Sequence, residues 1–182
     1  MKKTVISLGI LLLGLCILFG CNKEKTPTAT TGAPLFSDFT ANDLDGNTVD
    51  QTVFSQSKLT MINIWGTFCG PCINEMPELG ELNRELPDVQ VIGIIIDAVD
   101  ANLQPLEKEM ADAHSIISQT GADYLHLLPS PDLINAYLYN VQAVPETIFV
   151  DANGNQVGES YLGARSKAQW LQIIDGLLEG MQ

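Results

Sequence analysis

A pair of cysteines that directly follows a short apolar segment constrains this chain of 182 residues more than any other feature. Residues 59–64 are mostly apolar, as is typical of a buried strand. The chain continues over 65–72 as Trp-Gly-Thr-Phe-Cys-Gly-Pro-Cys. We expect the strand to deliver Cys69 to a surface and a helix to begin there, which places Cys72 one turn further along that helix.

A cysteine at the start of a helix is favoured as a thiolate. Unpaired backbone N–H groups and the positive end of the helix dipole face the Cys69 sulfur and stabilise a negative charge on it. The thiolate is the attacking species in disulfide exchange, and Cys72 is placed to displace the mixed disulfide that results. Pro71 fits the first turn because the N–H that it lacks would have no partner within the helix. The pattern therefore predicts a dithiol site in which Cys69 attacks and Cys72 resolves.

Three other uses of the cysteine pair are open at this point. A zinc site needs more ligands than the pair, and the chain has only His114 and His126 and no second Cys pair. A permanent disulfide suits an oxidising compartment. A peroxidatic cysteine lies in a threonine-containing loop, and Thr67 is present. The Gly-Pro dipeptide between the cysteines favours the dithiol over the peroxidatic site.

The N-terminus predicts export. Met-Lys-Lys is followed by an apolar stretch over 5–19, which has the length of the hydrophobic region of a signal peptide and is short for a transmembrane span. It ends in Leu-Phe-Gly-Cys, which resembles the lipobox of bacterial lipoproteins. We therefore expect 1–20 to be a signal peptide and Cys21 to carry lipid, with an uncleaved membrane anchor as the alternative. Both place the rest of the chain outside the cytoplasm.

The remaining chain reads as a tether and one domain. Residues 21–34 are polar and rich in Thr, as expected for a lipid anchor point and a flexible tether. The segment 35–182 is long enough for one domain with a core and too short for two. Because Cys16 lies in the predicted signal peptide and Cys21 at its cleavage site, the predicted domain keeps only the 69/72 pair.

The charge balance is strongly acidic. The chain has 22 Asp and Glu against 9 Lys and Arg, a formal net charge of −13. Such a surface argues against nucleic acid and anionic lipid head groups as direct partners. A solvated acidic surface is the simplest explanation of this composition.

Apolar periodicity alternates between strand and helix along the domain. We expect strands at 36–40, 47–49, 59–65, 89–96, 124–128, 147–150 and 156–162, and helices at 69–86, 102–120, 131–139 and 166–180. The run over 89–96 is almost continuously apolar, as in a strand buried on both faces. Asp45-Gly46 is a hairpin signal. This order predicts an α/β fold with a mixed sheet that helices cover on both faces.

Four sequence landmarks occur together in this chain: the 64–72 segment with its Cys-Gly-Pro-Cys, Glu75 with Pro77, Val-Pro-Glu-Thr-Ile-Phe-Val-Asp at 144–151, and Asp-Ala-Asn-Gly at 151–154. In combination they resemble the exported thioredoxin-fold thiol-disulfide oxidoreductases of the TlpA/ResA/DsbE type. The resemblance runs from about residue 33 to the C-terminus. It implies a thioredoxin fold with an N-terminal β-hairpin, and it makes the helix around 102–120 with its following strand the insertion usual in this family.

The resemblance also implies a substrate-binding rim. Pro145 has the place of the family's cis-proline beside the cysteines, where the backbone of Val144 is available to pair with an extended substrate segment. Phe68 stands where the family usually has Trp and keeps the rim apolar. The residues expected to bind substrate are Trp65, Phe68, Gly70, Pro71, Val144 and Pro145.

Two positions bear on proton transfer. Asn63 stands where thioredoxins have a buried Asp, and an amide cannot accept the proton that such an Asp accepts. Glu75 is where ResA-like proteins have a carboxylate, one turn after Cys72. A buried Glu75 has a raised pKa and is suited to shuttle a proton to or from Cys72. The alternative is a surface helix charge, like Glu78.

By resemblance, we expect a reductant on the outer face of the bacterial cytoplasmic membrane. The Gly-Pro dipeptide favours a potential near that of thioredoxin, about −270 mV, over that of DsbA, about −120 mV. Expected clients are apocytochrome c or an exported methionine sulfoxide reductase, and the expected electron donor is a membrane protein of the CcdA/DsbD type. We expect a monomer with no cofactor and no metal. A thiol peroxidase and a Sco-like copper-binding protein are the alternative functions.

Overall fold

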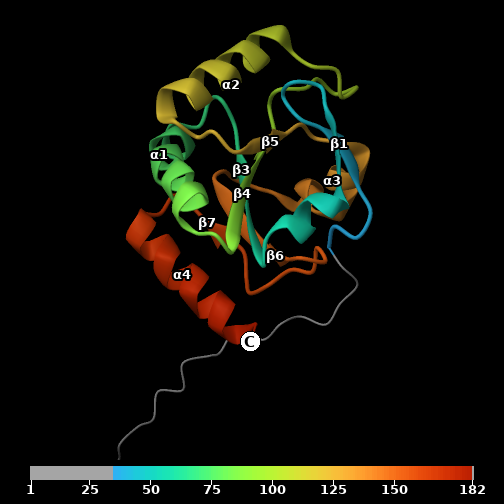
Figure 1. Ribbon diagram of the computed structural model, residues 1–182. Helices are drawn as coiled ribbons and strands as arrows, with labels where there is room; N and C mark the ends of the chain where they lie inside the picture. The colour runs from blue at the N-terminus through green and yellow to red at the C-terminus, as the bar shows by residue number, and fades with distance from the viewer. Residues whose placement is uncertain (1–34, 182) are drawn as a thin grey trace, which may run out of the picture.

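A five-stranded mixed sheet forms the centre of the molecule (Figure 1). The computed structural model describes residues 35–181, so the predicted signal peptide, the Cys21 lipidation site and the tether lie outside it. In spatial order the strands are β5 Leu125–Leu127, β4 Val89–Ile95, β3 Leu59–Trp65, β6 Glu146–Asp151 and β7 Tyr161–Leu162. The first three strands are parallel to one another, and β6 is antiparallel to β3 and β7.

The central strand β3 is buried along its whole length. It pairs with β4 from Leu59 opposite Val89 to Trp65 opposite Ile95. Neighbouring side chains on a strand point to opposite faces of the sheet, so β3 supplies apolar side chains to both faces. Two apolar cores result, one on each side of the sheet.

Three helices cover one face of the sheet: α1 Gly70–Glu85, α2 Glu107–Thr120 and α4 Lys167–Gly180. In Figure 1, α1 and α4 lie beside each other on this face. Their side chains pack on Met61 and Phe149 of the sheet. The buried residues of these two helices that form this core include Met76, Leu79, Leu82, Trp170, Ile174 and Leu177. Since α1 joins β3 to β4, its first turn lies at the carboxyl edge of the sheet.

Shorter elements cover the opposite face. They are β1 Thr40–Asn42, β2 Thr48–Asp50, the 3-10 helix η1 Gln51–Gln56, α3 Pro131–Ala136 and the 3-10 helix η2 Leu138–Asn140. β1 and β2 form an antiparallel hairpin. The rings of Phe36, Phe39 and Phe54 lie with centroids 5.6–6.1 Å apart in the core below this layer.

The structure confirms the predicted thioredoxin-like fold, with a mixed sheet and helices on both of its faces. The predicted N-terminal hairpin is present, with Thr40 opposite Asp50. A helix and a strand, α2 and β5, are found where the insertion was expected. In the part of the chain that the structure describes, no helix has both the length and the apolar character to cross a membrane.

Several predicted element boundaries are wrong. The strand expected at 36–40 begins only at Thr40, because Phe36 and Phe39 are drawn into the aromatic core. The helix expected at 102–120 begins at Glu107, after a turn that is closed by a bridge between Val99 and Pro105.

Two other segments are more broken than expected. The helix expected at 131–139 ends at Tyr137, which leaves the helical conformation, and continues as η2. The strand expected at 156–162 pairs only over Tyr161–Leu162, with one isolated bridge from Gln156 to Val150.

Candidate active site

The two cysteines lie where β3 passes into α1. Cys69 is the residue that caps the N-terminus of α1, and it forms a disulfide with Cys72 across a Cα–Cα distance of 5.3 Å. The backbone N–H of Cys72 points at the Cys69 sulfur, 3.2 Å away. Cys69 keeps 5% of its surface exposed, whereas Cys72 is completely buried. The expected placement of the first cysteine at a helix start is therefore confirmed.

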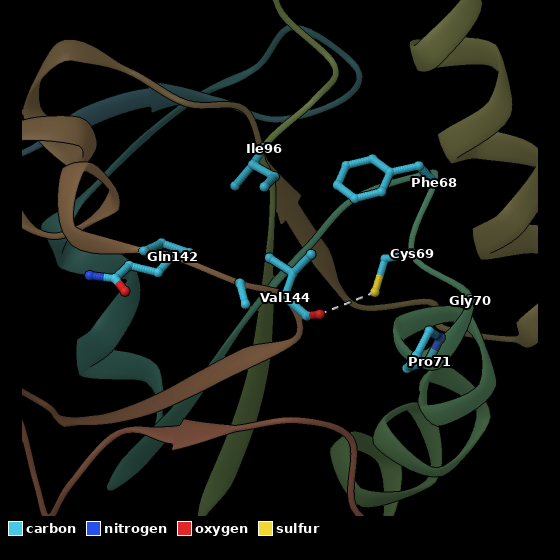
Figure 2. Close-up of a pocket in the computed structure, with 9 residues that line it drawn as sticks. Phe68, Cys69, Gly70, Pro71, Ile96, Gln142 and Val144 are labelled. Atoms are coloured by element: carbon cyan, nitrogen blue, oxygen red, sulfur yellow. Dashed lines mark hydrogen bonds between the residues drawn. The ribbon is translucent and has the colours of Figure 1, made fainter.

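The loop before β6 lies against the first cysteine. The Cys69 Sγ is 3.6 Å from the carbonyl oxygen of Val144, as the dashed line in Figure 2 shows. The peptide bond between Val144 and Pro145 is cis, as the family resemblance implied. Pro145 is buried, and Val144 is half-buried with its backbone next to the sulfur. The structure therefore brings together the two segments that were expected to meet at the site.

An open groove of about 450 Å³ begins at Cys69. Figure 2 shows its two walls, one from the loop and first turn at the cysteines and one from the loop before β6. Phe68 stands on the rim with 69% of its surface exposed. The groove is lined by Phe68, Cys69, Gly70, Pro71, Ile96, Val141, Gln142, Ala143 and Val144. Four of the six expected substrate-binding residues, all except Trp65 and Pro145, line it.

Glu75 is buried one turn after Cys72, with only 3% of its surface exposed. One carboxylate oxygen, Oε1, accepts a hydrogen bond from the indole N–H of Trp170 at 2.7 Å and one from the backbone N–H of Arg165 at 2.9 Å. The other, Oε2, has no hydrogen-bond partner among the described residues. Glu75 is therefore not a surface helix charge like Glu81, which is exposed and pairs with Lys167.

Burial raises the pKa of the Glu75 carboxyl above its usual value. The two hydrogen bonds and the Arg165 guanidinium act in the opposite direction, and they are outweighed. Arg165 also lies over the Tyr161 and Trp170 rings, at 5.1 and 5.2 Å from their centroids. Glu75 is thus held as a group whose protonation changes at a higher pH than that of an exposed glutamate.

Comparison with known proteins agrees with this geometry. A model of the AhpC/TSA family matches residues 32–155, which is more than half of the chain. This chain belongs to the AhpC/TSA family. The thiol-disulfide oxidoreductase ResA of Geobacillus thermodenitrificans is 30% identical to it over 179 residues, which cover 97% of this chain and 94% of that protein. With the Cys69–Cys72 disulfide, the protein is a ResA-like thiol-disulfide oxidoreductase.

Solved structures share the fold of this oxidoreductase. A thiol:disulfide interchange protein of the thioredoxin family from Chlorobium tepidum superposes with a TM-score of 0.63 at 23% identity, over 85% of this chain and 99% of that one. A DsbF homologue from Corynebacterium diphtheriae also has a TM-score of 0.63, at 22% identity, over 87% of this chain and 98% of that one. These likenesses agree with the predicted thioredoxin-like architecture.

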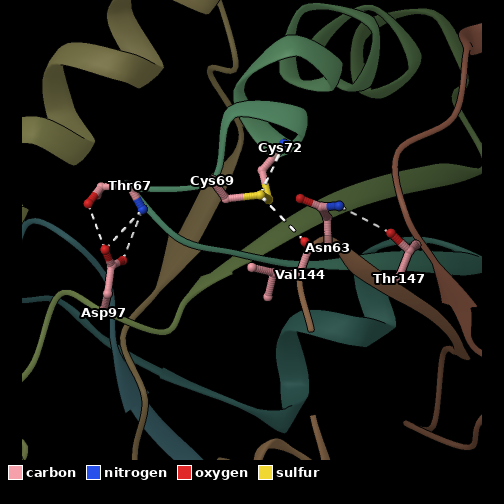
Figure 3. The surroundings of a disulfide bond; sticks show 7 residues. All are labelled: Asn63, Thr67, Cys69, Cys72, Asp97, Val144 and Thr147. Carbon is pink, nitrogen blue, oxygen red and sulfur yellow. Dashed lines mark hydrogen bonds between the residues drawn. A yellow bond between two sulfur atoms is a disulfide. The ribbon is translucent and has the colours of Figure 1, made fainter. Parts of the chain in front are cut away.

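Asn63 of the oxidoreductase is buried in β3 beside the cysteines. Its amide N–H donates to the hydroxyl of Thr147 on β6 at 3.1 Å, and its amide oxygen has no partner among the described residues. Figure 3 shows this oxygen turned toward the disulfide. An amide has no proton to gain or lose in the accessible pH range, so Glu75 is the titratable side chain nearest in sequence to the cysteine pair.

Trp65 differs from its expected place on the substrate-binding rim, because it is completely buried and does not line the groove. Its indole N–H donates to Nδ1 of His126 at 3.2 Å, and Nε2 of His126 lies 3.0 Å from the carbonyl oxygen of Ala122. This arrangement fits a neutral imidazole that carries its proton on Nε2. Burial lowers the pKa of His126 to about 4, which keeps the ring neutral at physiological pH.

Asp97 was not found from the sequence, yet it holds the loop before the cysteines. Its carboxylate oxygens accept hydrogen bonds from the Thr67 backbone N–H at 3.0 and 3.1 Å and from the Thr67 hydroxyl at 2.6 Å (Figure 3). The pairing of the two predicted strands, 59–65 and 89–96, is the feature that could have pointed to Asp97. Because Trp65 is opposite Ile95 in a parallel pair, residues two positions further on leave the sheet side by side.

These contacts bear on the alternative chemistries. Thr67 directs its hydroxyl to Asp97, whereas a peroxidatic site would need it at the cysteine. Both ring nitrogens of His126 are engaged within the core, so it does not face the cysteines as a metal ligand. Within residues 35–181, no cluster of three or more His, Cys, Asp or Glu side chains is arranged to hold a metal ion. The geometry favours the dithiol.

We expect Asp97→Ala to lower the free energy of unfolding by about 1 to 3 kcal/mol, since it leaves the Thr67 N–H and hydroxyl without a charged acceptor. Urea unfolding measured by tryptophan fluorescence checks this expectation. Asp88→Ala is the matched control, because its carboxylate pairs only with the exposed Lys58, and its cost is expected to stay below about 1 kcal/mol. Equal stability of the two variants would contradict the role of Asp97.

Proposed function

We propose that this oxidoreductase is a membrane-anchored, extracytoplasmic reductant of client protein disulfides. The observation that carries the proposal is the Cys69–Cys72 pair at the start of α1, with the first sulfur at the end of an open groove and the second buried behind it. This asymmetry suits a two-step exchange, because a client disulfide reaches only Cys69 and Cys72 reacts only from within the protein.

Charge around the pair supports a reducing direction. A strong oxidant such as DsbA has a reduced form that is specially stabilised, with a Cys pKa of about 3.5. Here the Cys69 sulfur receives one backbone N–H, and each Lys or Arg of the described chain is engaged elsewhere. Those cations and their partners are Lys58 with Asp88, Arg84 with the Gly121 carbonyl, Lys108 with Asp112, Arg165 with the Leu162 and Gly163 carbonyls, and Lys167 with Glu81 and Glu85. Without a cation from residues 35–181 at the sulfur, the dithiol form gains little extra stability.

The exchange proceeds in two displacements. In the reduced protein the Cys69 thiolate attacks one sulfur of the client disulfide, so that the client S–S bond breaks and one client thiolate leaves. A mixed disulfide then joins Cys69 to the client. The Cys72 thiolate attacks the Cys69 sulfur, closes the disulfide seen in the structure and releases the second client thiolate, which takes a proton. Two electrons have passed to the client, and a membrane dithiol protein of the CcdA/DsbD type returns them.

Glu75 is proposed as the base that serves Cys72. It lies one turn along α1 from that cysteine, in the buried region where water is scarce, and its Oε2 is not committed to another described group. Accepting the Cys72 proton prepares the thiolate for the second displacement. Arg165 and Trp170 position the carboxylate by holding Oε1.

The groove is proposed as the place where the client cysteine enters. Phe68, Gly70 and Pro71 form one wall, and the Val144 backbone forms the edge on which an extended client segment pairs. Two of the expected rim residues do not reach the groove and are proposed to support its walls from within. They are Pro145, which follows Val144, and Trp65, the last residue of β3, and both are buried. Support for the compartment comes from the sequence: 1–20 reads as a signal peptide and Cys21 as a lipidation site. Apocytochrome c and an exported methionine sulfoxide reductase fit such a location.

Trapping in cells tests the proposed function. In Cys72→Ala the mixed disulfide on Cys69 cannot be resolved, so we expect client proteins to accumulate as adducts in the membrane fraction. Mass spectrometry of the reduced adducts identifies the clients, and exported proteins with Cys pairs are the expected result.

Two variants make the trapping experiment decisive. The Cys69→Ala/Cys72→Ala protein is the control and is expected to trap nothing. Adding Cys21→Ser to Cys72→Ala is expected to move the adducts out of the membrane fraction or leave an uncleaved precursor. Adducts with cytoplasmic proteins, or none above the double-alanine control, would contradict the proposal.

We expect Glu75→Gln to slow the second displacement roughly tenfold to a hundredfold while changing the first displacement little, because only Cys72 depends on the carboxylate. In the wild type, resolution should slow as the pH falls through the raised pKa of Glu75, since the protonated carboxyl cannot accept a proton. The Gln variant should lack this part of the profile. Stopped-flow reduction of a model disulfide across pH separates the two steps.

Glu78→Gln is the matched control for this measurement, because Glu78 lies on the same helix but accepts a bond from the backbone N–H of Lys167. Superimposable pH profiles of the wild type and both variants would show that Glu75 has no part in the exchange.

A further inference from the structure

A second groove, of about 390 Å³, continues from the groove at Cys69. The two grooves share Ile96 and Val141, so they form one channel along the surface. We call the second one the apolar shelf. Its other lining residues are Val99, Asp100, Ala101, Leu103, Pro129, Ile134, Leu138 and Tyr139.

One wall of the apolar shelf is a preformed turn in the segment between β4 and α2. The Asp100 carboxylate accepts hydrogen bonds from the backbone N–H groups of Asn102 at 2.8 Å and Gln104 at 2.9 Å. Leu103, between them, has a φ of 61°, in the left-handed region that a leucine seldom adopts. The turn therefore holds an apolar side chain at a groove in a conformation that a polar Asn or a Gly would adopt more readily.

The other wall comes from η2 and presents Tyr139 with 85% of its surface exposed. Large apolar side chains that are this exposed and gathered at a groove mark interaction sites more often than isolated ones do. Tyr139 and Phe68 are the two most exposed large apolar residues of the described chain, and they stand at the two grooves of one channel.

The charge of the apolar shelf is negative. Asp100 is its one charged lining residue, and hydrogen bonds from Gln104 and Asn102 hold the pKa of its carboxyl below the usual value. The chain as a whole has a formal net charge of −13. A partner segment with a basic side chain is thus favoured over an acidic one.

We propose that the apolar shelf binds the client segment that flanks the cysteine under attack, with an apolar client side chain against Leu103 and Tyr139 and a basic one near Asp100. Continuity with the groove at Cys69 carries this assignment, because residues 141–144 run from the shelf to the reacting sulfur. The proposal rests on the dithiol exchange at Cys69 and is independent of which protein is the client. It makes the shelf a determinant of client sequence.

A peptide scan tests the proposal. Gly/Ser-rich peptides with one cysteine are activated as mixed disulfides with 5-thio-2-nitrobenzoate, which is a good leaving group and directs attack to the peptide sulfur. Cys69 of the full-length Cys72→Ala chain in detergent attacks that sulfur; a peptide–Cys69 disulfide forms and 5-thio-2-nitrobenzoate leaves. Adducts on Cys69 are quantified by mass spectrometry, and each rate is divided by the rate with the small symmetric disulfide of the same leaving group.

We expect Leu at one distance from the cysteine to raise this rate ratio roughly three- to tenfold over Ser. Leu103→Asn, which suits the left-handed backbone, and Tyr139→Ser should each remove most of the gain. Asp100→Asn keeps acceptors for the turn and should reduce the preference for a Lys-containing over an Asp-containing peptide. Met181→Ser, an exposed apolar site at the opposite edge of the sheet, should leave the ratios as in the parent.

Three results would overturn the proposal: rate ratios that do not depend on Leu position, shelf variants that keep the Leu gain, or a Met181→Ser variant that loses it equally. A dimer in sedimentation velocity that Tyr139→Ser dissociates would also overturn it, because the shelf would then be covered by a second copy of the chain. Loss of reaction with the small disulfide as well would locate the failure in the dithiol chemistry and not in the shelf.

Discussion

The parallel pairing of β3 with β4 in one register is the constraint on which the site depends. With Trp65 opposite Ile95, both strands end at the same edge of the sheet, and the chain beyond each of them meets the other. Ligand and reaction sites of α/β proteins form at this edge because loops diverge there above a rigid sheet. The bonds between Thr67 and Asp97 close this junction and fix the loop that leads to Cys69.

The same register explains why Gly93 is in the middle of β4, opposite Asn63. A Cβ at Gly93 would lie 2.2 Å from Nδ1 of His126 and 3.0 Å from the indole nitrogen of Trp65. The indole and the imidazole therefore meet in the space that a side chain at position 93 would fill. This buried pair holds the last residue of β3, and the Asp97 carboxylate holds Thr67 in the loop that follows. Both contacts support the segment that leads to Cys69.

Electrostatics then assign different roles to two neighbouring cysteines. Cys69 faces a backbone N–H and the end of a groove, whereas Cys72 is buried with a carboxyl whose pKa is raised. The helix start favours a thiolate at the first position, and the proposed role of Glu75 is to take the proton from the second. In the proposed account, the acidic surface and the apolar channel determine which client segment binds beside Cys69.

Local patterns predicted the parts of the molecule that depend on local chemistry. The buried runs of β3 and β4, the helix start at Cys69, the hairpin at Asp45-Gly46 and the cis bond before Pro145 were all foreseen from short segments or from the family resemblance. What was missed depends on contacts between distant segments. Arg165 and Trp170 reach Glu75 across 90 and 95 residues, and no local pattern of the chain points to them.

Tertiary packing also reversed two expectations. Trp65 belongs to the same sequence motif as Phe68, which stands on the rim. Side chains alternate between the two faces of β3, however, and this alternation turns Trp65 into the core toward His126. Phe36 and Phe39 are three positions apart and do not follow the two-residue alternation of a strand. Both are buried against Phe54, and the segment before Thr40 does not form the expected strand. At Trp65 the strand conformation decided which way the side chain points, whereas at Phe36 and Phe39 the burial of the aromatic rings decided the local conformation.

Alkylation of the reduced full-length protein tests the central claim, which is that the helix start makes Cys69 the attacking thiolate. Limiting iodoacetamide is added across a pH series, and modification of Cys69 and Cys72 is quantified separately by mass spectrometry. The account predicts that Cys69 is labelled first, with a midpoint near pH ~7 as in thioredoxin, and that Cys72 is labelled only after unfolding. Preferential labelling of Cys72, or a Cys69 midpoint near the ~8.5 of an ordinary thiol, would contradict it.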